Sequence, residues 1–149
     1  MVTNFAEPSL PTASVFGMKV HLSNDYGHWL ENCLHRGQGV HVVTLNSEMV
    51  MLAEKEPAVQ EVIQGAELVI PDGAGVTIYL KLEGIEQGRC PGIELAEAMV
   101  RHIGKSGSNQ KIAFYGGAPG ITDLAAQRWQ REYPGLKILA NHGFLTESE

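Results

Sequence analysis

The stretch "LVIPDGAGVTIYLKLE", residues 68–83, joins a short apolar run to an amphipathic pattern through one acid and a glycine. Residues 68–71 predict a buried strand, and residues 73–83 predict a helix with Val76, Tyr79 and Leu80 facing inward. A strand that passes directly into a helix is typical of α/β domains with parallel strands. The acid between them, Asp72, stands where the predicted strand ends.

The same alternation continues on both sides of this stretch. Further strands are predicted at residues 15–21, 40–45, 112–115 and 137–140, with amphipathic helices between them. Ser23 or Asn24 is expected to cap the first helix, and Pro57 to kink or restart the second helical stretch. This order predicts a Rossmann-like α/β fold, a mostly parallel sheet with helices on both faces. One domain is expected over residues 15–149, after a disordered lead-in of residues 1–14.

Composition narrows the function classes. The 149 residues carry a net charge of −6 and show no basic stripe, which argues against nucleic-acid binding. No apolar run reaches the length of a membrane span, and residues 1–14 lack the pattern of a secretory signal. Cys33 is expected to be buried and Cys90 to lie exposed in a polar loop, both as reduced thiols. No histidine shows metal-ligand spacing, although His142 lies near a strand end, and no cofactor or metal is expected.

Asp72 has two interpretations. Aspartate is a good N-cap, so it can simply begin the helix that follows. Alternatively it is a general base, because apolar walls around a carboxylate raise its pKa and make it a better proton acceptor near neutral pH. The two roles are compatible, since a helix start also directs backbone N–H groups at a site.

Other polar residues follow the predicted strands, where open α/β sheets bind ligands. Thr44 and Asn46 are either a strand residue and a helix cap or a hydroxyl and an amide that recognise a sugar. Arg89, in a Gly- and Pro-rich loop, is either a solvated side chain or a clamp for a diphosphate. If the strands are neighbours, these residues line one crevice with Asp72 and Gly73.

The turn "GGAPG", residues 116–120, follows the predicted strand 112–115. Its glycines, Gly116, Gly117 and Gly120, let backbone N–H groups approach a ligand, and the helix start after them favours phosphate. It is neither a phosphate-binding Walker loop nor the dinucleotide fingerprint. A plain turn is the alternative.

Read in order, the motifs "TLNSE", "PDGAG", "RCPG", "GGAPG" and "YPGL" resemble the WecG/TagA/CpsF glycosyltransferases over roughly residues 15–145. The resemblance implies transfer of N-acetylmannosamine, or a related sugar, from a UDP-sugar to lipid-linked N-acetylglucosamine, with inversion. It implies a role in bacterial cell-surface polysaccharide or teichoic acid synthesis. The protein would then act in the cytoplasm, at the inner face of the cell membrane.

The resemblance also assigns roles to residues. Asp72 would be the catalytic base and Arg89 would stabilise the diphosphate leaving group. Substrate would be bound by Thr44, Asn46 and Gly73, and on the nucleotide side by Gly116, Gly117 and Gly120. Because the acceptor hydroxyl attacks opposite the leaving UDP, the reaction needs a base on one side and positive charge on the other.

This sequence departs from the family's pattern at its end. A glutamine-containing motif and a basic C-terminal tail that contacts the membrane are expected of the family and are missing here. The chain is therefore expected to be truncated, and an open sheet edge makes a homo-oligomer a further expectation. A truncated, non-catalytic nucleotide-sugar-binding module is the alternative function. An unrelated nucleotide-dependent enzyme is disfavoured by the absent dinucleotide fingerprint.

Overall fold

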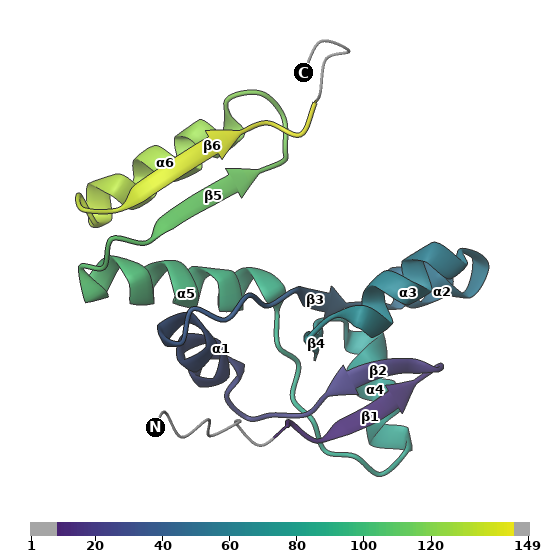
Figure 1. Ribbon diagram of the computed structural model, residues 1–149. Helices are drawn as coiled ribbons and strands as arrows, with labels where there is room; N and C mark the ends of the chain where they lie inside the picture. Colours follow the sequence, from purple (N-terminus) through teal and green to yellow (C-terminus); the bar gives the residue numbers. More distant parts are fainter. Residues whose placement is uncertain (1–8, 145–149) are drawn as a thin grey trace. The chain divides into compact units, whose positions relative to one another are not determined.

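The computed structural model describes residues 9–144, and these divide into two compact units with the boundary between Ala96 and Glu97. Each unit is described by itself. Both combine short strands with helices, so the predicted α/β class is confirmed (Figure 1). The single domain expected over residues 15–149 stays a prediction, and residues 1–8 of the expected lead-in lie outside the described residues.

The first unit begins with a β-hairpin. Strand β1 (Thr12–Val15) pairs antiparallel with β2 (Met18–His21). The single strand expected over residues 15–21 is wrong, because Phe16 and Gly17 form a two-residue turn with φ of 48° and 80°. Such a turn requires positive φ at both positions, and Asn-Gly is its usual sequence.

Two parallel strands form the centre of the first unit. Strand β3 (Val42–Leu45) pairs with β4 (Leu68–Pro71), with Leu45 opposite Pro71 at their carboxyl ends. All of β4 is buried, as its continuously apolar sequence predicts. Helix α1 (Tyr26–His35) precedes them, and Asp25 rather than the expected Ser23 or Asn24 is its N-cap.

Three further helices complete this unit. Asn46 caps α2 (Ser47–Lys55), and α3 (Pro57–Gly65) begins at its proline, which confirms the predicted restart. Helix α4 (Ala74–Leu82) follows β4, and α2 and α3 lie side by side (Figure 1). The main core joins β1 to β4 with these helices through buried side chains.

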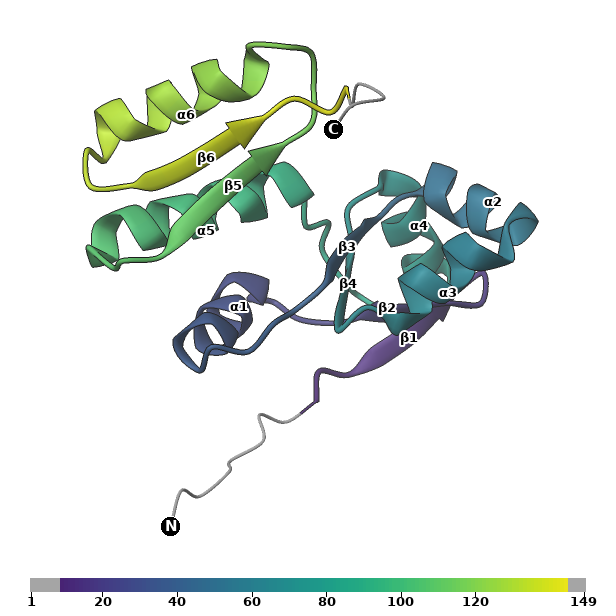
Figure 2. The ribbon, with the colours of Figure 1, turned by 45° about the horizontal axis from the view of Figure 1, so that its top comes forward.

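The second unit contains most of α5 (Gly92–Ser106), then β5 (Lys111–Tyr115), α6 (Ile121–Glu132) and β6 (Lys137–Asn141). β5 and β6 are parallel, with Lys111 opposite Lys137, and α6 lies along β6 (Figure 2). Within the described residues, the strands form three two-stranded sheets rather than the one larger sheet expected. Two of the three are parallel, as predicted.

Candidate active site

The carboxyl ends of β3 and β4 meet at one point in the first unit. The backbone N–H groups of Asp72 and Gly73 both donate to the carbonyl oxygen of Leu45, at 3.0 and 3.2 Å. The polar residues that follow the two strands are therefore neighbours, as the parallel arrangement predicts. Thr44, Asn46, Asp72 and Gly73 come together here.

Asp72 directs its carboxylate at a loop that is distant in sequence. Its Oδ1 forms an ion pair with Arg89 Nη2 at 3.2 Å, and its Oδ2 accepts a hydrogen bond from the Gly92 N–H at 3.2 Å. The N-cap interpretation is wrong, because α4 has Gly73 at its N-cap and no side-chain cap. The Asp72 side chain is 25% exposed, so a ligand can reach it.

Backbone and side-chain bonds fix the loop that carries Arg89. The Arg89 Nε donates to the carbonyl oxygen of Asp72, and the Cys90 N–H donates to the Pro71 carbonyl at 2.8 Å. The amide of Gln87 accepts from the Ser23 N–H at 3.0 Å and donates to the Ser23 carbonyl at 2.9 Å. Sequence reasoning missed Gln87, because its partner is 64 residues away.

Close packing places Thr44 and Asn46 beside these groups. A Cβ at Gly92 would lie 2.3 Å from Thr44 Cγ2, and one at Gly73 would lie 3.0 Å from the Asn46 Cα. Both glycines therefore allow approaches that a side chain would block. The Asn46 Oδ1 accepts from the Met49 N–H at 2.9 Å, which confirms its capping role.

Cys90 lies next to the carboxylate and is half-buried, whereas the sequence predicted exposure. Burial raises the pKa of its thiol, and the negative charges of Asp72 and Glu94 raise it further. The thiol is therefore a poor nucleophile at neutral pH. Cys33 is a buried free cysteine, as predicted.

The glycine turn belongs to the second unit. Gly116, Gly117 and Gly120 have positive φ values of 120°, 71° and 86°. The Gly116 N–H donates to the Asn141 carbonyl at 3.0 Å, which closes the turn against the end of β6. Gly120 is the N-cap of α6, without a side-chain cap. His142 follows β6, and its buried Nδ1 has no hydrogen-bond partner within the described residues.

Two wider searches covered the described part of the chain. Residues 9–144 contain no group of three or more His, Cys, Asp or Glu side chains arranged to hold a metal ion. Within the same residues, no helix combines the length and the apolar character that crossing a bilayer requires.

The arrangement of a carboxylate, an arginine and a hydroxyl at the ends of parallel strands agrees with a family comparison. Residues 13–149 match the model of the "Glycosyl transferase WecG/TagA/CpsF family". The chain belongs to this family. Similar curated proteins are named N-acetylglucosaminyldiphosphoundecaprenol N-acetyl-beta-D-mannosaminyltransferase.

Two of these relatives show how much is shared. The protein from Bacillus spizizenii is 28% identical over 118 residues, which cover 78% of this chain and 45% of the relative. The protein from Staphylococcus aureus strain NCTC 8325 is 29% identical over 107 residues, which cover 70% of this chain and 41% of the relative. The chain thus spans less than half the length of the curated relatives it matches.

Proposed function

We propose that the chain carries the catalytic carboxylate of an inverting glycosyltransferase. The donor is a UDP-sugar that carries N-acetylmannosamine or a related sugar, and the acceptor is N-acetylglucosamine on a polyprenyl diphosphate. The acceptor class follows from the names of the relatives. The reaction would belong to cell-surface polysaccharide or teichoic acid synthesis, at the inner face of the cell membrane.

The position of Asp72 is the observation that carries the proposal. It follows a fully buried strand, and two donors, Arg89 and the Gly92 N–H, orient its two carboxylate oxygens. A base held by rigid elements can take the proton of the acceptor hydroxyl as the new glycosidic bond forms. Thr44, packed against Gly92, places a hydroxyl beside it.

Positive potential for the leaving diphosphate is available next to this carboxylate. Arg89 is more exposed than its partner, at 56% against 25%, and it lines a groove of about 430 Å³ together with Lys81. The start of α4 has no side-chain cap, so its first N–H groups can also face an anion. A diphosphate that competes for Arg89 would release Asp72 Oδ1 to the acceptor hydroxyl.

The test is UDP release from UDP-N-acetylmannosamine by the 149-residue chain, with and without a lipid-linked N-acetylglucosamine acceptor. Release that depends on the acceptor is expected, and Asp72→Asn should lower it by about 10²–10⁴-fold while UDP-sugar binding persists. Asp25→Asn is the matched control, because asparagine also caps helices and leaves α1 intact.

Arg89→Ala should weaken UDP binding, turnover or both, and unchanged kinetics would show a solvated loop arginine instead. Full turnover by Asp72→Asn would overturn the base assignment. Binding of the UDP-sugar without any turnover by the folded chain would favour the binding-module alternative.

A further inference from the structure

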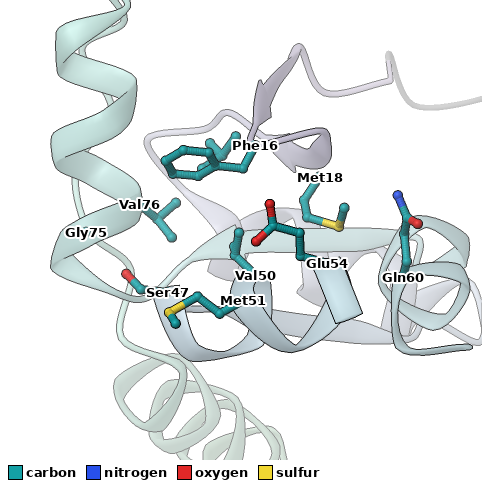
Figure 3. A pocket seen from close by; sticks show the side chains of 10 residues that line it. Phe16, Met18, Ser47, Val50, Met51, Glu54, Gln60, Gly75 and Val76 are labelled. Carbon is teal, nitrogen blue, oxygen red and sulfur yellow. The ribbon is translucent and has the colours of Figure 1, made fainter. Parts of the chain in front are cut away.

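A mostly apolar pocket opens beside the candidate active site, in the first unit. Its volume is about 450 Å³, within the usual range for small-molecule sites of roughly 300–1,000 Å³. Figure 3 shows side chains converging on it from the β1–β2 hairpin, α2, α3 and α4. The apolar part of the lining is Val15, Phe16, Met18, Val50, Met51 and Val76.

The pocket begins within two residues of the candidate active site. Ser47 and Gly75 both line it; Ser47 directly follows Asn46, and Gly75 lies two residues after Gly73. The two elements touch, since a Cβ at Gly75 would lie 2.2 Å from the Ser47 Oγ. The first residues of α2 and α4 therefore form the border between the polar strand ends and the apolar pocket.

The charge of the lining selects the ligand. Glu54 contributes a carboxylate, and none of the described residues that line the pocket is basic. A phosphate or a sugar diphosphate placed here would meet a like charge without a cation to offset it. An uncharged hydrocarbon chain gains from leaving water and needs no polar partner.

Phe16 supplies an independent observation. It has a φ of 48° in the hairpin turn, where Asn or Gly is the favoured residue, and a bulky residue there is strained. Its ring is nevertheless 67% exposed and forms one wall of the pocket, with Met51, 58% exposed, on the α2 side (Figure 3). An apolar ring held in a costly conformation at a pocket mouth indicates contact with a ligand.

We propose that this pocket binds the isoprenoid chain of the acceptor, at the units next to the diphosphate. The inference rests on the proposed function. The diphosphate would lie at the border, near the starts of α2 and α4, while Glu54 keeps the anionic end out of the pocket. The pocket would thus distinguish lipid-linked acceptors from free sugar phosphates.

The methionines permit a direct test on the 149-residue chain. Met18 and Met51 line the pocket, whereas Met99 lies on α5 in the second unit. With methyl-¹³C methionine, farnesyl diphosphate below its micelle concentration should shift the Met18 and Met51 signals and leave Met99 in place. Inorganic diphosphate at the same concentration should leave Met18 and Met51 unshifted.

Phe16→Asn is the decisive variant, because asparagine tolerates the positive φ and so preserves the turn. It should weaken farnesyl diphosphate binding at least tenfold. Leu52→Asn is the control: Leu52 is exposed on α2 at 44% and lies outside the pocket lining. Equal binding by Phe16→Asn, or unshifted Met18 and Met51 signals with farnesyl diphosphate, would overturn the proposal.

Two further outcomes separate this proposal from the proposed function. If farnesyl diphosphate shifts Met18 and Met51 but no acceptor-dependent transfer occurs, the pocket stands and the transferase function fails. If transfer to a lipid-free acceptor is as fast as to a farnesyl-linked one, the pocket proposal fails alone. Shifts of Met18 and Met51 that depend on protein concentration without ligand would also overturn it, because a second copy would then cover the pocket.

Discussion

The two units of this chain use the same strand-turn-helix plan but bury it to different degrees. In the first, every residue of β4 is buried between helices and the β1–β2 hairpin. In the second, residues of β5 and β6 alternate between exposed and half-buried. The proposed base follows the buried strand, whereas the glycine turn follows the half-exposed one. Rigid support is thus concentrated where the chemistry needs a fixed carboxylate.

Truncating an isoleucine in each unit should give the largest difference. Ile70 is fully buried in β4, so Ile70→Ala should cost about 2–5 kcal/mol of unfolding free energy. Ile138 in β6 is half-buried, and Ile138→Ala should cost about 1–2 kcal/mol.

The tryptophans report the two units separately, because Trp29 lies in α1 and Trp129 in α6. Single-tryptophan variants, Trp29→Phe and Trp129→Phe, would follow urea unfolding by fluorescence in each unit. Equal losses for Ile70→Ala and Ile138→Ala would contradict the contrast in burial.

Two glycines should fail for different reasons. A methyl at Gly92 would lie 2.3 Å from Thr44 Cγ2, so Gly92→Ala should cost about 1–3 kcal/mol through overpacking. Gly120 has open space around it but a φ of 86°, so Gly120→Ala should cost about 1–2 kcal/mol through backbone strain.

A double variant tells the two causes apart. Thr44→Ala removes the atom that Gly92→Ala meets, so combining them should recover part of the lost stability in a double-mutant cycle. The same Thr44→Ala change should leave the loss in Gly120→Ala untouched. Gly88→Ala, in the Arg89 loop with open space around it, is the control and should change stability by less than about 0.5 kcal/mol.

Sequence predicted the elements whose signals are local. The strand 68–71 and the helix 121–132 have the predicted bounds, because the apolar run and the flanking glycines and prolines mark them. The hairpin was missed because its turn is Phe-Gly rather than Asn-Gly, so one strand was expected over residues 15–21.

The candidate site shows the same limit. Parallel β3 and β4 brought Thr44, Asn46 and Asp72 together as predicted. The partners of the Asp72 carboxylate were not predictable, because Arg89 and the Gly92 N–H come from a loop 17 and 20 residues away. Local propensity favours a cap for the next helix, and tertiary contacts override it.

The smallest effect expected is a pH dependence confined to the first unit. His21 is buried, and its Nδ1 accepts from the Val69 N–H of β4 at 2.9 Å. Burial lowers the pKa of His21, and the positive charge of Lys19 lowers it further. The folded state therefore binds this proton less readily than the unfolded chain, whose histidine pKa is about 6.5.

The sign of the effect follows from proton linkage. Above about pH 6.5 the imidazole is neutral in both states and its contribution to stability is complete. As the pH falls from there through the folded-state pKa, the unfolded chain takes up the proton first, so unfolding becomes easier. A protonated Nδ1 also cannot accept from Val69, so the link between β2 and β4 is lost. Unfolding followed at Trp29 between pH 7.5 and 5 should show this decline, and His21→Asn should flatten it. His28→Asn, at an exposed position, should not; an unchanged profile in His21→Asn would assign the decline to another group.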